Sequence, residues 1–182
     1  MKKVVLTFGL IAGAILSVMM FVTLPFQDEI GFDRGAIIGY TTMVAAFLLI
    51  YFGTRSYRDN VGGGTVSFGR ALAVGASIAM VASVCYVASW EVIYFTMAPD
   101  FMAKYEVHAI AKARQDGASE VVIAQKHAEM AKLAELYRNP AINAAMTLAE
   151  PLPVGLLIAL VSAAALSRRR GPATTAEFQP SR

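Results

Sequence analysis

The charged residues of this chain are confined to short intervals, and the stretches between them are long and apolar. Only 16% of the 182 residues are charged, whereas 57% are hydrophobic. A helix rises about 1.5 Å per residue, so about 20 apolar residues cross a hydrocarbon core of about 30 Å. The long apolar stretches cover residues 4–26, 35–52, 71–97 and 143–166. They predict an all-α integral membrane four-helix bundle that forms a single membrane domain, residues 1–170.

The first stretch has two interpretations, because a cleaved signal peptide also begins with basic residues such as Lys2 and Lys3. The uncharged run that starts at Val4 is longer than the apolar region of a usual signal peptide. No motif of small residues follows Phe26, where cleavage would be expected. We therefore expect an uncleaved span.

Small residues recur at a spacing of four on every expected span, which places them on one helix face. In a membrane, such a face lets another helix backbone approach closely. These residues are Gly9 and Gly13, Gly35 and Gly39, Gly75 and Ala79, and Gly155 and Ala159. We expect them to be helix-packing positions in a tight bundle, and the same pattern suggests a homo-oligomer.

A polar segment, residues 99–139, separates the third and fourth expected spans. Phe101–Gln115 is predicted to form one helix, Asp116 and Gly117 a break, and Ser119 the N-cap of a second helix. Apolar residues at helical spacing give the second helix one apolar stripe. The segment therefore predicts an amphipathic helical hairpin that lies on the membrane or packs on a partner. The tail, residues 171–182, has no periodicity and is predicted to be disordered.

Two histidines lie at equal distances from the break in this hairpin. His108 and His127 would therefore face each other, and Glu106 and Glu129 stand in the same relation. Such a group could bind a metal, but two isolated histidines are better explained by ordinary packing or surface roles. We predict no metal site and no cofactor. The single cysteine, Cys85, allows neither an intrachain disulfide nor a zinc-binding spacing.

The distribution of basic residues predicts the orientation in the membrane. Four spans place both termini on one side. That side carries most of the basic residues near the spans: Lys2, Lys3, Arg55, Arg58, Arg70 and Arg168 to Arg170. Since basic loops stay inside, both termini are predicted to be cytoplasmic and the hairpin extracytoplasmic. Basic residues beside spans contact anionic lipid, so we predict no nucleic-acid partner.

Two acids lie within or at the ends of the expected spans. Glu91 follows Trp90 near the outer end of the third span, where it is either an interfacial carboxylate in water or part of a polar site. Glu150 precedes Pro151 and Pro153 in the fourth span. Counted from the cytoplasmic ends of their spans, both acids fall in the outer third of the membrane and nearly level.

Glu150 has three interpretations. In the first, Pro151 and Pro153 kink the helix, and a protonated Glu150 satisfies the freed carbonyl groups. In the second, Glu150 titrates in a wet cavity, with Glu91 as a neighbour of like charge. In the third, residues 143–149 form an outer interfacial turn and Glu150 caps a span that begins at Pro151.

Several segments together resemble a known family. The matching segments are Asn139-Pro140, Glu150-Pro151-Leu152-Pro153-Val154-Gly155-Leu156 with the basic cluster that follows, and Thr65-Val66-Ser67-Phe68-Gly69-Arg70. They are similar to the bacterial domain-of-unknown-function family numbered 4199. The resemblance implies a four-span bacterial inner-membrane protein of unassigned activity. It supplies no catalytic residues.

The sequence contains none of the HExxH, GxSxG or paired-aspartate motifs of membrane enzymes, so we predict no catalytic residues and no enzymatic activity. The leading hypothesis is a structural or modulatory component of the cell envelope that contacts a protein partner through the hairpin. The alternative is a small proton- or cation-linked transporter that uses Glu150 with Glu91. Four spans are few for a carrier, so this alternative requires an oligomer.

Overall fold

The computed structural model describes residues 1–167, and the predicted disordered tail lies outside this part of the chain. Its elements are α1 (Lys2–Thr23), a 3-10 turn (Leu24–Phe26), α2 (Gln27–Ile30), α3 (Phe32–Asn60), α4 (Phe68–Val92), a π turn (Ile93–Met97), α5 (Phe101–Gln115), α6 (Glu120–Tyr137), α7 (Pro140–Leu148) and α8 (Pro151–Leu166). No strand is present in the described residues. The predicted all-α class is confirmed.

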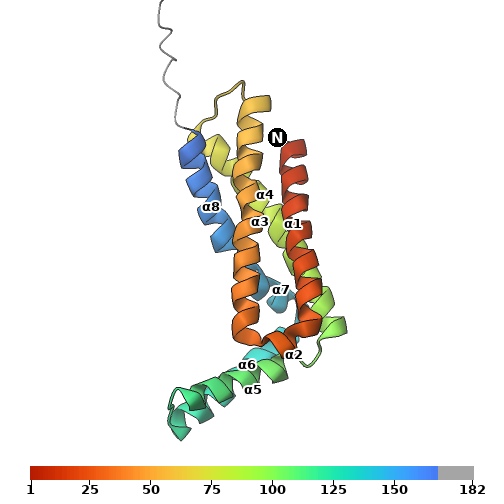
Figure 1. The fold of residues 1–182 in the computed structure, drawn as a ribbon, viewed down its shortest axis with the longest axis vertical. Coiled ribbons are helices and arrows are strands. Elements are labelled where there is room, and N and C mark those ends of the chain that lie inside the picture. The colour runs from red at the N-terminus through yellow and green to blue at the C-terminus, as the bar shows by residue number, and fades with distance from the viewer. Residues whose placement is uncertain (168–182) are drawn as a thin grey trace, which may run out of the picture.

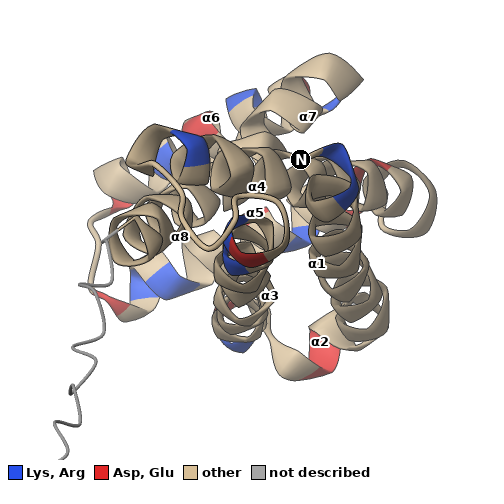
Figure 2. Cartoon of the chain, turned by 90° about the horizontal axis from the view of Figure 1, so that it is seen from above, with Lys and Arg blue, Asp and Glu red and all other residues tan. Residues whose placement is uncertain are grey.

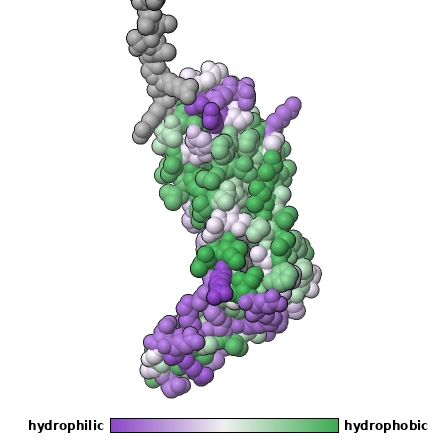
Figure 3. Space-filling view, viewed as in Figure 1, coloured by the Kyte–Doolittle hydropathy of each residue, from purple (hydrophilic) through white to green (hydrophobic). Residues whose placement is uncertain are grey.

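Four helical segments are long and apolar enough to cross a membrane: Lys2–Ile30, Phe32–Asn60, Phe68–Met97 and Pro140–Leu166. α1 begins and α8 ends at the same end of the bundle, and the hairpin of α5 and α6 lies at the opposite end (Figure 1). In Figure 2, α1 carries basic residues at its start and no charge along the rest of its length, and acidic residues follow at α2. Figure 3 shows the corresponding hydrophobic band between a polar end and a polar hairpin. The predicted four-span bundle is therefore confirmed.

α4 lies at the centre of the bundle and packs against α1, α3 and α8. Its buried face carries small and branched residues, so the neighbouring backbones come close. The fully buried side chains at this centre include Phe47 and Ile50 of α3 and Val74 and Ile78 of α4. The core of the molecule is thus the contact of α4 with its three neighbours.

Glycines and alanines make these close contacts possible, as the spacing predicts at most positions. A β-carbon placed on any of four glycines would come within 3.0 Å of a neighbouring side chain: Gly9 against Val81, Gly13 against Cys85, Gly75 against Ala159 and Gly155 against Ala79. Gly53, which the spacing did not single out, has the same role, because its β-carbon would lie 2.6 Å from Ile78. Gly53 lacks a small partner four residues away, so no stripe marks it in the sequence.

The second pair of glycines differs from this expectation. A β-carbon on Gly39 would meet no atom within 4 Å, and one on Gly35 would meet only the flexible side chain of Gln27. No other helix of the described chain packs closely on this face. Both glycines line the cavity described below instead.

α3 is longer than the span of residues 35–52 that the apolar pattern predicts. The helix continues past Gly53 through Asn60, and the run of three glycines that follows from Gly62 ends it. Arg58 and Asp59 lie in this extension and form an ion pair with a 2.7 Å contact. The turn that follows uses Gly63 and Gly64 at φ 63° and 85°, a conformation that other residues rarely adopt. The apolar run therefore marks the membrane-crossing part of the helix and not its ends.

Candidate functional site

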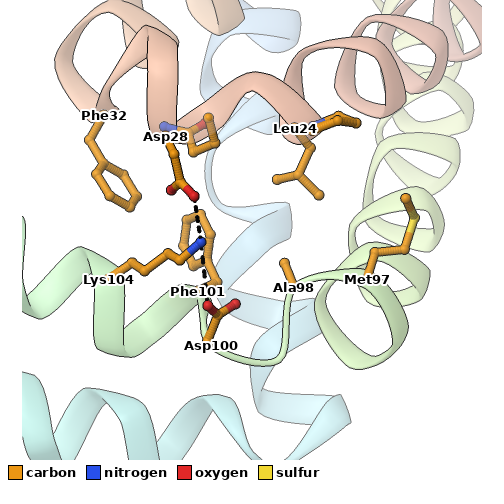
Figure 4. A pocket seen from close by; sticks show the side chains of 10 residues that line it. Leu24, Asp28, Phe32, Met97, Ala98, Asp100, Phe101 and Lys104 are labelled. Carbon is orange, nitrogen blue, oxygen red and sulfur yellow. Dashed lines mark hydrogen bonds and ion pairs between the residues drawn. The ribbon is translucent and has the colours of Figure 1, made fainter.

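The hairpin is fixed to the end of the bundle by ion pairs. Lys104 of α5 contacts Asp28 of α2 at 2.8 Å and Asp100 at 3.3 Å (Figure 4). About two turns further along α5, Lys112 contacts Asp33 of α3 at 2.8 Å. These hydrogen bonds to carboxylates raise the pKa values of Lys104 and Lys112. Because all five side chains are exposed, the pairs orient the hairpin more than they stabilise it.

An aromatic cluster completes the attachment. The ring of Phe32, at the start of α3, lies 5.6 Å from that of Phe101 and 5.4 Å from that of Tyr105, both in edge-to-face geometry. The His108 ring is 5.2 Å from the same phenylalanine. Three successive turns of α5 therefore contact one residue at the start of α3.

The histidines do not face each other as the symmetry about the break predicts. His108 turns toward α3, where its Nε2 atom is 3.5 Å from Asp33. His127 instead pairs with Glu106 across the hairpin, with 2.8 Å between Nδ1 and Oε1. No group of three or more metal-ligating residues occurs in residues 1–167. The difference arises because α5 has two neighbours, α6 and α3, whereas the symmetry about the break relates α5 to α6 alone.

A cavity of about 940 Å³ separates the hairpin from the bundle. Its walls come from the halves of α1, α3 and α4 nearer the hairpin, from both hairpin helices and from α7. α8 reaches only as far as Pro151, and α7, which continues the chain, packs on α4 rather than on α3. The cavity therefore occupies the place that a continuous fourth helix would fill.

Glu150 lies in the junction between α7 and α8, at the cavity wall. Pro151 is the first residue of α8, where its missing N–H requires no partner, and Pro153 lies in the same turn. The Glu150 side chain does not cap the helix. Its Oε2 atom accepts a hydrogen bond of 2.7 Å from the Tyr86 hydroxyl of α4. The chain thus changes from one helix to the next at Glu150 and presents its carboxylate to the cavity.

A buried asparagine that the sequence analysis did not identify holds this junction in place. Asn143 of α7 accepts a hydrogen bond from the Trp90 indole at 2.9 Å and another from Thr147 at 3.2 Å. Its side-chain amide donates to the backbone carbonyl of Tyr137 at 3.3 Å. The sequence signal for this role was a polar residue, Asn143, within an apolar run. Its partners on α4 and α6 are distant in the sequence, so only the fold reveals them.

Glu91 is not part of this cavity. It lies on α4 five residues beyond Tyr86, about 7.5 Å along the helix, and it is absent from the cavity wall. Its Oε1 atom is buried and has no hydrogen-bond partner in the described chain. The structure therefore brings Glu150 together with tyrosines and a tryptophan, and not with Glu91.

These features define a class: an α-helical, multi-pass membrane protein with a polar hairpin at one end and a cavity beneath it. The model of the family described as "Protein of unknown function (DUF4199)" matches residues 7–168. The chain belongs to this family, as the resemblance of its sequence segments predicts. Comparisons with curated proteins and with solved structures found no match.

Proposed function

We propose that this protein is a non-enzymatic structural or modulatory component of the bacterial cell envelope. It lies in the inner membrane with both termini in the cytoplasm, and its hairpin contacts a protein partner outside. The basic residues at the terminal end of the bundle support this orientation, because positively charged segments remain in the cytoplasm.

The hairpin surface carries the proposal. One side of the hairpin is attached to the bundle, while two valines on its helices are exposed and lie outside the cavity wall: Val107 at 71% and Val121 at 68%. The attachment by Lys104 and Lys112 keeps this surface in a defined position beyond the bundle. Exposed apolar side chains on a fixed, otherwise polar element are typical of a protein interaction site.

The test is to place a photo-crosslinking residue at Val107 or Val121 in living cells, with Val161, a membrane-facing position on α8, as the control. The hairpin positions are expected to capture a defined protein that Val161 does not capture. A variant that lacks residues 103–138 is expected to lose both this product and the phenotype of the intact protein. If both persist in that variant, the proposal is wrong.

The orientation has its own test. In a Cys85→Ser background, a single cysteine at Ala118 in the hairpin turn is expected to react with a membrane-impermeant maleimide in intact cells. A cysteine at Gly63, at the opposite end, is expected to react only after permeabilisation. If the cysteine at position 63 reacts in intact cells, the proposed orientation is wrong and the termini lie outside the cytoplasm.

A second candidate function is a small proton- or cation-linked transporter that works as an oligomer. The position of Glu150 at the cavity wall favours it, because ionisable residues at membrane depth mark substrate and ion pathways. This candidate uses Glu150 without Glu91, which lies outside the cavity. Proton or cation flux into liposomes that is lost in Glu150→Gln and kept in Glu91→Gln would support this candidate. Equal flux in these two variants and in the unaltered protein would exclude it.

A further inference from the structure

We propose that the cavity between the bundle and the hairpin binds an organic ammonium ion, with Glu150 as the counter-ion and Tyr40, Tyr86, Trp90 and Tyr137 as the aromatic wall. The inference concerns binding alone. It holds whether or not the ligand crosses the membrane, and it does not depend on a protein partner at the hairpin.

The Glu150 carboxylate is the first feature that points to a cation in the cavity. Its hydrogen-bond partner is the Tyr86 hydroxyl, and no basic side chain of residues 1–167 forms an ion pair with it. A carboxylate at membrane depth is costly unless a positive charge or several hydrogen bonds compensate it. Glu150 is exposed at the cavity rather than buried among protein atoms, and one phenol leaves most of this requirement unmet. A cation in the cavity would meet it.

The second argument is the aromatic composition around the carboxylate. Tyr40 comes from α3, Tyr86 and Trp90 from α4, and Tyr137 from the end of α6, so three separate elements bring rings to one cavity. Burial raises the pKa of Tyr137, and the negative charge of Glu150 adds to this shift, which places the phenol within electrostatic reach of the carboxylate. Aromatic faces beside an acid attract an ammonium group through cation–π and charge interactions.

The third argument is that two of these rings are held in position before any ligand binds. The Trp90 indole donates a hydrogen bond to the buried Asn143, and its ring contacts Phe101 at 4.9 Å in edge-to-face geometry. The Tyr86 hydroxyl is bound to Glu150. A preformed wall lowers the entropy cost of binding. A ligand therefore meets Trp90 and Tyr86 already in position.

The size and the ligand set exclude a bare metal ion as the natural occupant. Calcium takes six to eight oxygen ligands, and magnesium demands an octahedral site. Of the carboxylates in the described cavity wall, Asp33 is paired with Lys112, and Glu150 is the one that is hydrogen-bonded to one of these rings. No group of three metal-ligating residues exists in residues 1–167. A volume of about 940 Å³ instead lies at the upper end of the range for small organic ligands.

An ammonium group of this kind has two sources, a lipid headgroup or a free amphipathic amine, and one experiment separates them. The full chain is placed in nanodiscs of phosphatidylglycerol, which has no amine, and titrated with benzyltrimethylammonium. Trp90 is the single tryptophan and reports binding by its fluorescence. The matched probe is neopentylbenzene, which has the same shape without the charge.

We expect saturable quenching by the cation and binding of the neutral probe weaker by about tenfold or more. Glu150→Gln should weaken cation binding by a similar factor, whereas Glu91→Gln, the matched acid outside the cavity, should leave it unchanged. If phosphatidylethanolamine in the nanodisc competes with the probe, the ligand is a lipid headgroup. If it does not compete, the ligand is a free amine.

Two results overturn the proposal. Equal binding of the charged and neutral probes to the unaltered protein means that the cavity selects apolar shape and not positive charge. This comparison needs no variant, so it remains decisive if Glu150→Gln does not fold. The absence of saturable quenching by the cation also overturns it.

Discussion

Replacing Gly75 by alanine tests the close approach of α4 and α8. A β-carbon on Gly75 would lie 2.9 Å from the β-carbon of Ala159, 3.2 Å from its α-carbon and 3.1 Å from a methyl group of Ile50. Carbon atoms prefer separations of about 3.5–4.0 Å, so the two helices must move apart by several tenths of an ångström. Gly39→Ala is the matched control, because a β-carbon there meets nothing within 4 Å.

The expected magnitude follows from two opposing terms. Overpacking of a close contact costs about 1–3 kcal/mol. Both variants gain helix propensity of up to about 1 kcal/mol, because glycine is a poor helix former. This gain cancels when they are compared, so Gly75→Ala should be less stable than Gly39→Ala by about 1–3 kcal/mol. That difference corresponds to roughly a 5- to 150-fold change in the unfolding equilibrium constant.

Unfolding in mixed micelles with increasing dodecyl sulfate, followed by the fluorescence of Trp90, measures this difference. Gly75→Ala should unfold at lower dodecyl sulfate than the unaltered protein, and Gly39→Ala should unfold at the same or a higher fraction. If Gly75→Ala is as stable as Gly39→Ala, the packing of α4 on α8 is not as close as described, and the assignment of Gly75 as a packing residue is wrong.

Three further changes test other parts of the fold. Asn143→Ala removes three hydrogen bonds, so at about 0.6 kcal/mol for each bond in a membrane it should cost about 2 kcal/mol in the same micelle assay and should shift the emission of Trp90. Pro153→Ala should change stability by less than about 0.5 kcal/mol, because Pro153 is exposed in the first turn of α8, and a larger loss would contradict its place there. The Asp33 carboxylate raises the pKa of Lys112 above 10.5, and the Lys112 hydrogen bond lowers the pKa of Asp33 below 3.8. The contribution of the pair to hairpin attachment should therefore be complete between pH 3.8 and pH 10.5, and lost as the pH rises through the raised value or falls through the lowered one. A spin-label distance between α3 and α5 that changes within this window would contradict the assignment.

The hairpin was predictable residue by residue because its limits depend on local chemistry. Phe101–Gln115 is a helix as expected. Gly117 adopts a φ of 78°, and Ser119 accepts the capping hydrogen bond from the backbone N–H of Val122. A cap and a break act within three or four residues, so the sequence contains all the necessary information.

The cavity and its wall were not predictable in this way. The sequence places Glu150 in an apolar run, but its contact with Tyr86 joins residues 64 positions apart. Likewise, the spacing that marks Gly75 as a packing residue marks Gly39 equally, and only the path of the neighbouring helices distinguishes them. Periodicity identifies a face of a helix, whereas the occupant of that face is decided by how the elements come together.

The central position of α4 has a consequence for the order in which the protein is assembled. Three glycines of the first two spans, Gly9, Gly13 and Gly53, pack on residues of α4. During synthesis, α1 and α3 leave the ribosome before α4 does. At about 5–20 residues per second, the ribosome needs roughly two to six seconds to make the residues between the end of α3 and the end of α4. During that interval the glycine faces are covered by lipid or by an insertion factor, so the nascent chain is most vulnerable to mispairing at that stage.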